Sequence, residues 1–306
     1  MLIKDGLAYF AAGRNSFTDG GIFLFALDVP TGKVVHQRHM YGPYDDKGFP
    51  IENRDVVGGI SIEGFKGDIF LVAGDRLYMR HQAFNPDLTP VKLAEVKEPH
   101  LIPSHGFLEA IPQHRSFWTI DTALRYDIPT GFGGVHGDIL VMDGQRFYEV
   151  RGYQPGRTES FYPRAGGYTL YAGRYGGEPT VESVKKGKRK KRAFASTTAS
   201  SMKLWSSSIP LTGKAITLAG DVLFVAGTPV TFPEDDLAKA YEGRMGGVLW
   251  AASASTGEKL ANYALDAAPA WDGIAAANGM LFVSLADGRI VCMGPKDGTG
   301  CKVLGR

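Results

Sequence analysis

The sequence lacks two features that would suggest a membrane protein or a nucleic-acid-binding protein. It has no run of about 18 or more apolar residues, the length that a membrane-spanning helix requires, and its closest approach, residues 264–286, is interrupted by Asp266, Asp272 and Asn278. A strong net charge is also absent, because 34 Lys and Arg nearly balance 32 Asp and Glu, with a formal charge of +2 and a pI of about 8.4. The sequence therefore excludes a helical membrane span, and its overall charge gives no support for binding nucleic acid or an anionic membrane.

The chain also lacks a recognisable signal peptide and is poor in cysteine. Its first 17 residues, MLIKDGLAYFAAGRNSF, have no basic start, no uninterrupted apolar centre and no small-residue cleavage site, and they lead directly into a strand-like segment. This start is consistent with N-terminal truncation, in which case the missing signal does not identify a compartment. The only cysteines, Cys292 and Cys301, flank the turn-rich segment MGPKDGTG. A disulfide in an oxidising environment and two free thiols in a reducing cell both fit this arrangement.

Short strands and tight turns are what the composition favours. The 306 residues include 40 Gly, 17 Pro, 13 Tyr and 17 Phe, and hardly any segment shows a sustained apolar period near 3.6. A chain of this length can form two ordinary domains or one large all-β domain. The composition favours the all-β domain.

One stretch, residues 19–35 with the sequence DGGIFLFALDVPTGKVV, has the pattern of a strand, a turn and a second strand. Its apolar run, residues 22–27, is too short for an ordinary helix and is rich in residues that suit a pleated sheet. Asp28 can bind backbone amides a few residues on, Pro30 fixes φ, and Gly32 accepts the positive φ of a tight turn. The sequence therefore predicts a β-hairpin here.

The same unit recurs near the C-terminus, where GGVLWAASASTGEK, residues 246–259, repeats the layout of residues 20–33. Units of about 40–50 residues with a few short strands each are typical of a β-propeller, whose blades bury their faces against one another. We predict an all-β chain, a β-propeller of four-stranded blades, forming one domain over residues 1–306. About five or six blades would be present, as part of a larger ring of seven or eight. Further stretches share the layout: residues 5–40, 67–84, 137–153, 220–229 and 272–294.

Three segments do not fit the repeat. Residues 100–121 and 232–244 are expected to be insertions between strands, the second with a short helix. Residues 184–194 begin with VKKGKRKKR, whose clustered Lys and Arg would attract phosphates. The run contains no aromatic residue to stack on bases, so a solvated basic loop on the surface is the better interpretation and nucleic acid is not the expected ligand.

The repeat units resemble a known family. The segments ALDVPTGK at 26–33, ASASTGEK at 252–259 and the closing DGIAAANGMLFVSLADGRIVCMG at 272–294 are similar to the PQQ-binding-like (quinoprotein-type) β-propeller repeats of bacteria. That family includes quinoprotein alcohol dehydrogenases and outer-membrane assembly propellers. A wider likeness covers nearly the whole chain and resembles the C-terminal propeller portion of long members.

The family pattern Ala-x-Asp-x-x-Thr-Gly-x-x-x-Trp is incomplete in both copies. In the first copy the tryptophan is replaced by His36, and in the second the aspartate and the tryptophan are replaced by Ser253 and Ala261. The matching residues are Ala26, Asp28, Thr31 and Gly32 in the first copy and Ala251, Thr256 and Gly257 in the second. We interpret these residues as a blade-closing turn. Two tryptophans, Trp205 and Trp250, follow a leucine in strand-like runs and are expected to pack between blades.

The resemblance implies PQQ and Ca²⁺ as cofactors, but the residues that a catalytic quinoprotein needs are not recognisable. Such an enzyme holds calcium through oxygen ligands, uses a carboxylate as general base, and in many members has adjacent cysteines against the quinone. No adjacent cysteine pair occurs, and no set of Glu, Asn and Asp has a spacing that indicates one metal site. No cofactor is therefore predicted from the residues themselves.

The leading hypothesis is a non-catalytic propeller that binds or scaffolds a protein or polymer partner through its rim. The alternative is a quinone-dependent dehydrogenase whose cofactor ligands lie partly in missing upstream blades. A third hypothesis is a module that presents substrate to an upstream catalytic domain. The family resemblance further implies a periplasmic or secreted protein, with upstream blades or a partner covering any exposed blade edge.

One cluster of residues is the candidate for a ligand-binding rim: His100, His105, Glu109, His114 and Trp118. The histidines are not spaced as in a known zinc site, where pairs usually lie two to five residues apart. Histidines that only satisfy structural hydrogen bonds are the competing interpretation.

Overall fold

The described residues of the computed structural model form mainly β-strands, turns and loops. No helix in the described residues is long and apolar enough to cross a membrane. The chain divides into two compact units, Met1–Phe132 and Gly133–Arg306. The structure describes residues 1–42, 44–48, 67–80, 82–92, 95–96, 99–103, 118–121, 135–152, 168–175, 201–230, 239 and 243–294.

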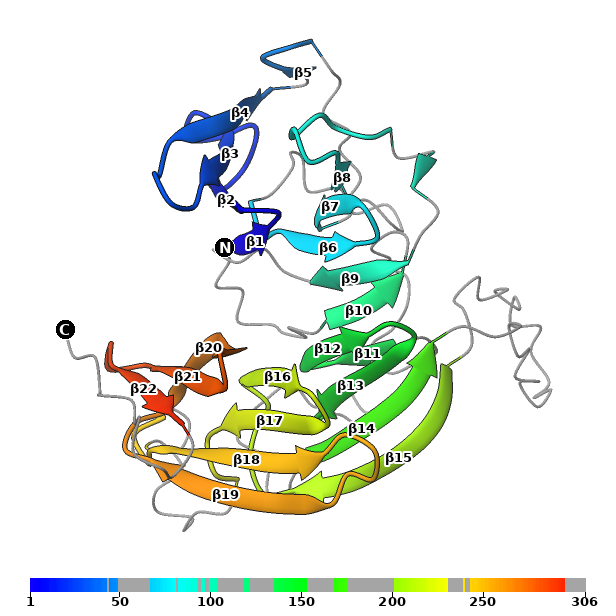
Figure 1. Ribbon diagram of the computed structural model, residues 1–306, viewed down its shortest axis with the longest axis vertical. Coiled ribbons are helices and arrows are strands. Elements are labelled where there is room, and N and C mark those ends of the chain that lie inside the picture. Colours follow the sequence, from blue (N-terminus) through cyan, green and yellow to red (C-terminus); the bar gives the residue numbers. More distant parts are fainter. Residues whose placement is uncertain are drawn as a thin grey trace, which may run out of the picture. The chain divides into compact units, whose positions relative to one another are not determined.

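The first unit contains two sheets and a hairpin (Figure 1). In the five-stranded sheet and in the three-stranded sheet each strand pairs antiparallel with the next strand in the sequence. The strands of the first sheet are β1 (Leu2–Lys4), β2 (Leu7–Ala12), β3 (Ile22–Asp28), β4 (Val34–Tyr41) and β5 (Tyr44–Asp45). The second sheet has β6 (Leu71–Ala73), β7 (Arg76–Met79) and β8 (Gln82–Phe84), and the hairpin has β9 (His100–Pro103) and β10 (Trp118–Asp121).

The second unit begins with β11 (Val135–Gly137) and contains three further sheets with the same consecutive antiparallel order. Two of these sheets have four strands and the last has three. They are formed by β12 (Ile139–Asp143), β13 (Arg146–Arg151), β14 (Tyr168–Tyr175) and β15 (Ser201–Ile209); by β16 (Ala215–Ala219), β17 (Val222–Gly227), β18 (Gly247–Ser253) and β19 (Lys259–Leu265); and by β20 (Pro269–Ala277), β21 (Met280–Leu285) and β22 (Ile290–Met293).

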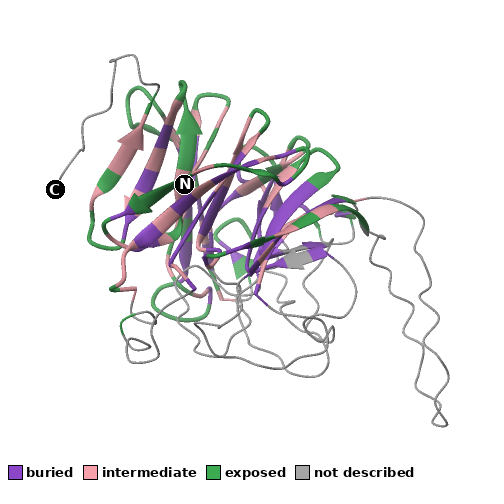
Figure 2. Cartoon of the chain, turned by 90° about the horizontal axis from the view of Figure 1, so that it is seen from below, coloured by how far each residue is buried: buried purple, intermediate pink, exposed green. Residues whose placement is uncertain are grey.

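Small sheets of consecutive antiparallel strands are the blades of a β-propeller, so the predicted fold class is confirmed. Of the sheets that the described residues form, only two have the four strands expected for every blade. Buried and exposed residues alternate along many strands, as Figure 2 shows, because successive side chains of a strand point to opposite faces. Such a strand contributes its buried side chains to one face of its sheet, whereas β7, β8 and β13 have consecutive buried residues and are buried on both faces.

The turn after β3 has the geometry that the sequence predicts. The Asp28 carboxylate accepts hydrogen bonds from the Thr31 amide, at 3.0 Å, and from the Thr31 hydroxyl. The Gly32 amide donates to the Asp28 carbonyl at 2.7 Å, and Gly32 has φ +67°. Because only glycine adopts this φ without strain, the Thr-Gly pair reverses the chain into β4.

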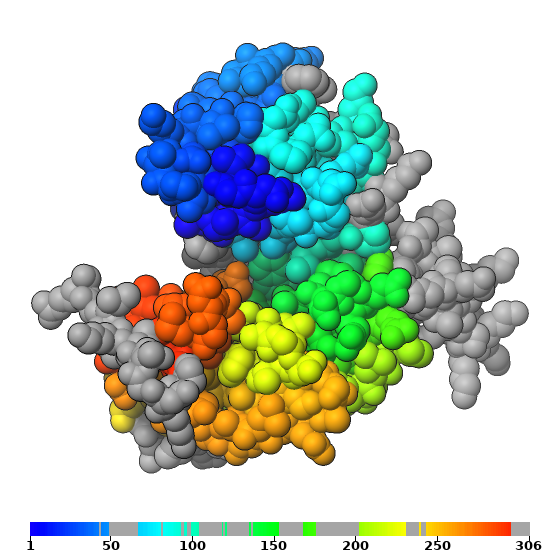
Figure 3. Space-filling view, in the orientation of Figure 1, coloured from blue at the N-terminus to red at the C-terminus, as the bar shows by residue number. Residues whose placement is uncertain are grey.

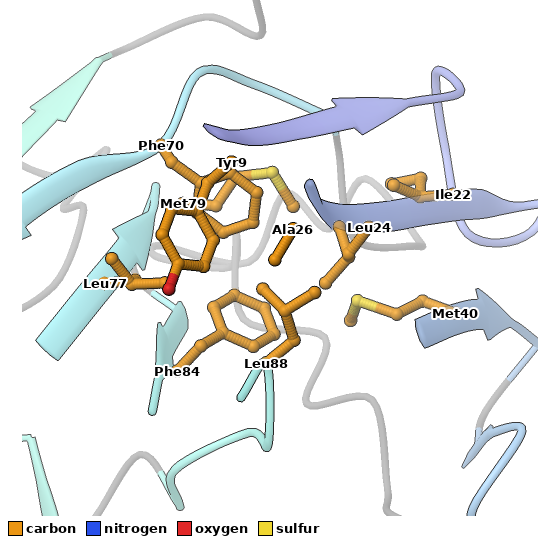
Figure 4. Packing of buried hydrophobic residues seen from close by; sticks show 10 residues of the cluster. All are labelled: Tyr9, Ile22, Leu24, Ala26, Met40, Phe70, Leu77, Met79, Phe84 and Leu88. Atoms are coloured by element: carbon orange, nitrogen blue, oxygen red, sulfur yellow. The ribbon is translucent and has the colours of Figure 1, made fainter. Parts of the chain in front are cut away.

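The core of the first unit lies between the first two sheets. Its aliphatic and aromatic side chains come from alternate positions of β2, β3 and β4 on one side and from β7, β8 and neighbouring residues on the other (Figure 4). Arg38, which is also buried, forms an ion pair with Asp45 and donates to the Leu88 carbonyl at 2.7 Å. The cluster comprises Tyr9, Ile22, Leu24, Ala26, Met40, Phe70, Leu77, Met79, Phe84 and Leu88.

Candidate binding surface

The first sheet carries a row of stacked rings on the face opposite its core. We call this set the aromatic face: Phe10, Phe23, Phe25, His39 and Tyr41. Ring centroids are 5.2 Å apart for Phe10 and Phe25, 4.1 Å for Phe23 and His39, and 5.8 Å for His39 and Tyr41. Neighbouring rings are nearly parallel, with 4° between the planes of Phe23 and His39. The rings therefore form one continuous ladder across β2, β3 and β4.

Strand register places these rings together. Phe10 lies opposite Phe25, and Phe23 lies opposite His39, so each pair is a direct cross-strand neighbour. The His39 ring is further oriented by a hydrogen bond between Nε2 and the Gly20 carbonyl, at 2.7 Å. The ladder is thus held in place by the backbone of its own sheet.

The aromatic face is open to solvent at its outer end. Phe23 is 36% exposed and Tyr41 is 55% exposed, and Tyr44, opposite Tyr41 in the register, is also exposed. The residues of this sheet are coloured blue in Figure 3. Contiguous exposed apolar surface on a water-soluble domain usually marks a site where another molecule binds. This face is therefore the candidate binding surface.

A second notable cluster lies inside the sheet of β12–β15. The Glu149 side chain is fully buried and contacts the Arg151 guanidinium, which lies 4.2 Å from the centroid of the Tyr171 ring. Burial raises the pKa of Glu149 to about 8, against the opposing effect of Arg151, and the charge of Asp138 raises it further. The carboxyl group therefore keeps its proton at a pH where an exposed glutamate is ionised.

The predicted ligand-binding rim is described only in part. His100 lies in β9, is 2% exposed, places Nε2 2.9 Å from the Arg80 carbonyl and stacks on Tyr78 at 3.9 Å. Trp118 lies opposite Pro103 in the β9–β10 ladder and is also buried. Both side chains thus contribute to the interior. The remaining three residues of the set, His105, Glu109 and His114, lie outside the described residues.

The two tryptophans predicted to pack between blades occupy different environments. Trp205, in β15, donates from Nε1 to the Ala254 carbonyl at 3.0 Å, so it contacts the turn between β18 and β19. Trp250, in β18, is half-buried, and the Lys259 ammonium lies 4.7 Å from its ring centroid. Trp205 therefore connects two sheets of the second unit.

In the part of the chain that the structure describes, no group of three or more His, Cys, Asp or Glu side chains could hold a metal ion. Cys292 is disulfide-bonded, and the other cysteine of the chain, Cys301, lies outside the described residues. The basic segment 184–194 also lies outside them, as do most residues of the insertion 232–244.

Sequence reasoning missed the aromatic face. Phe23 and Phe25 alternate with Leu24 and Ala26, so the run is apolar on both faces and reads as a strand buried on both sides. The signal that could have identified the face is the pairing of Phe23 with His39 across the hairpin. The predicted hairpin brings the two strands together, but the sequence does not indicate that the rings of Phe23 and His39 lie on an exposed face.

Comparisons with known proteins assign no family. No family model matches the chain, and no curated protein matches it. Among solved structures, BamB from Moraxella catarrhalis is similar with a TM-score of 0.37 and 15% sequence identity, covering 98% of this chain and 72% of that chain. The computationally designed Ika8 protein is similar with a TM-score of 0.37 and 7% identity, covering 99% of this chain and 84% of that chain.

Proposed function

We propose that this chain is a non-catalytic β-propeller module that binds or scaffolds a protein partner. The observation that carries the proposal is the aromatic face, where five stacked rings stand on one sheet and the outer ones are exposed. Covering such a face with an apolar protein surface removes about 25 cal/mol of unfavourable hydration for each Å² buried. A rigid ladder also loses little side-chain entropy on binding, which favours affinity.

The resemblance to PQQ-type repeats is consistent with a binding role. The repeats supply the blade architecture, whereas the residues that a catalytic quinoprotein needs are not recognisable in the sequence. The ALDVPTGK segment forms the end of β3 and the turn that follows it. The hydrogen bonds of Asp28 with Thr31 and Gly32 are formed within this segment. A disulfide at Cys292 supports an oxidising compartment, so we propose a periplasmic or secreted location.

The proposal is tested by comparing three forms of the purified chain as bait in an extract of the source cells. The face variant Phe23→Ser/Tyr41→Ser removes the outer rings. The matched control Leu260→Ser/Tyr263→Ser removes two side chains of similar exposure from β19, 56% and 47% respectively. A protein retained equally by wild type and control, and at least tenfold less by the face variant, is the expected result.

Two results would overturn the proposal. One is a set of retained proteins that does not distinguish the face variant from wild type. The other is retention of PQQ with Ca²⁺ in a one-to-one ratio together with dehydrogenase activity, because the chain would then be an enzyme. Circular dichroism of all three forms provides the control for folding.

A further inference from the structure

Sulfur atoms gather on one face of the sheet β20–β22. Cys292 lies opposite Phe282 in the register of β22 and β21, so their side chains share a face, and Met280, two residues before Phe282, lies on the same face. The distance from Cys292 Sγ to Met280 Sδ is 3.9 Å. Cys292 is disulfide-bonded, and Cys301 is the only other cysteine of the chain. Cys301 lies outside the described residues, and the disulfide alone adds its sulfur to this group.

This face of the sheet is turned away from the apolar core. The buried residues of β21 point to the opposite face, where Met293 of β22 also packs against their cluster. Met280 and Cys292 alternate with these residues and are half-buried. Gly294 adds no side chain beside them, and Met280 Cγ, at 3.8 Å, is the one described atom within 4 Å of a Cβ built there. Small solutes can therefore reach the sulfur atoms.

The separation of the sulfurs suits a shared metal ion. Two sulfur ligands about 2.3 Å from one ion, with an angle of about 120° between their bonds, lie about 4 Å apart. Thiolate and thioether ligands are soft, and soft ligands select Cu(I). Structural Zn²⁺ sites use four Cys, His or carboxylate ligands. Among the described residues no group of three or more such side chains could hold an ion, so the sulfur set favours Cu(I) over Zn²⁺.

We propose that the reduced chain binds one Cu(I) ion through the Cys292 and Cys301 thiolates and the Met280 thioether, and that the disulfide form is the metal-free state. A dithiol reductant gives two electrons and two protons to the disulfide, whose S–S bond breaks, and the reductant itself becomes a disulfide. Cu(I) then displaces the two thiol protons, which pass to solvent. A reductant can reach Cys292 because this residue is only half-buried.

The test is a titration of the full chain with Cu(I) in the absence of oxygen. One sample is reduced with dithiothreitol, which is then removed, and a second sample keeps its disulfide. Competition with the chelator bicinchoninate measures the affinity. We expect one Cu(I) per reduced chain and no measurable binding by the disulfide form. X-ray absorption at the copper edge should show three sulfur neighbours at about 2.3 Å.

Three variants define the ligands. Met280→Leu keeps an apolar side chain and removes the sulfur, so the number of sulfur neighbours should fall from three to two and the affinity should fall about tenfold or more. Met293→Leu is the matched control, because Met293 is next to Cys292 in the sequence but on the opposite face. Its affinity should equal that of the wild type. Cys292→Ser/Cys301→Ser should not bind Cu(I).

Several results would overturn the proposal: no binding by the reduced chain, equal binding by the disulfide form, unchanged affinity with three sulfur neighbours in Met280→Leu, or equal binding of Zn²⁺. Loss of the β-sheet circular dichroism spectrum on reduction would also overturn it, because the sheet must hold Met280 beside Cys292. None of these variants changes the aromatic face. Failure of the copper site therefore leaves the proposed function intact, and a face variant that keeps its partners leaves the copper site intact.

Discussion

Stability should depend on pH through Glu149. This carboxyl group has an ordinary pKa of 4.5, and burial raises it to about 8 in the folded chain. Between these two values the folded state holds a proton that the unfolded state has released, so the unfolded state binds fewer protons and stability falls as pH rises. The contribution of Glu149 is therefore fully present below about pH 4.5 and is lost as pH increases through about 8.

The magnitude follows from the difference between the two pKa values. Each tenfold change in proton affinity corresponds to about 1.4 kcal/mol, so the free energy of unfolding should decrease by a few kcal/mol, with an upper limit of about 5 kcal/mol, between pH 4.5 and pH 8.5. The Arg151 guanidinium counteracts burial and is included in this value. A loss of this size is a large fraction of the stability of an ordinary domain.

The perturbation is Glu149→Gln, which keeps the shape of the side chain and removes its titration. The free energy of unfolding is measured by urea unfolding at 25 °C, followed by tryptophan fluorescence, from pH 5 to pH 8.5. It should decrease with rising pH in the wild type, and the decrease should be smaller by several kcal/mol in Glu149→Gln. Glu258→Gln is the control, since Glu258 is exposed in a turn. If wild type and Glu149→Gln have parallel pH profiles, Glu149 is not a buried, proton-holding carboxyl group and the reasoning is refuted.

Three further predictions concern stability, each measured by urea unfolding at constant pH. Gly32→Ala should lower the free energy of unfolding by about 1 kcal/mol because Gly32 has a positive φ, and Gly257→Ala should lower it by about 2 kcal/mol more because its Cβ displaces Trp205. Equal losses for the two variants would show that Trp205 does not pack against Gly257. Asp45→Ala should cost about 3–5 kcal/mol by leaving Arg38 buried without its partner, whereas the pair Arg38→Met/Asp45→Leu should be nearly neutral; an additive double variant would contradict this. Leu24→Ala should cost about 2–5 kcal/mol and Phe23→Ala under about 1 kcal/mol, since only Leu24 is in the core; the reverse order would show that the faces are misassigned.

Local sequence patterns were sufficient for the turns and strands. Asp28, Thr31 and Gly32 determine a hairpin through contacts within six residues, and the apolar run 22–27 lies within β3. The repeat of this unit at residues 246–259 indicated blades, and the consecutive antiparallel sheets confirm them. The number of strands per sheet was less predictable, because the ends of a sheet depend on pairing partners far along the chain.

The candidate site was not predictable in the same way. His100 belonged to the densest group of potential ligands in the sequence, yet its ring stacks on Tyr78 and bonds the Arg80 carbonyl, residues about 20 positions away. The histidine that contributes to the aromatic face is His39, which is not part of any ligand-like cluster. Residue type and spacing therefore do not indicate which of these side chains are buried, because burial depends on contacts that spacing does not specify.

By itself the sequence determined the elements of this protein: the strands, through alternating and apolar runs, and the turns, through Asp, Thr and Gly at fixed separations. These depend on interactions between residues close in the chain. Only the tertiary structure decided which sheet faces are covered, why the Trp205 ring packs against Gly257, and why Glu149 is buried beside Arg151. Such features arise when distant segments pack together, so similar local sequences can have different surroundings.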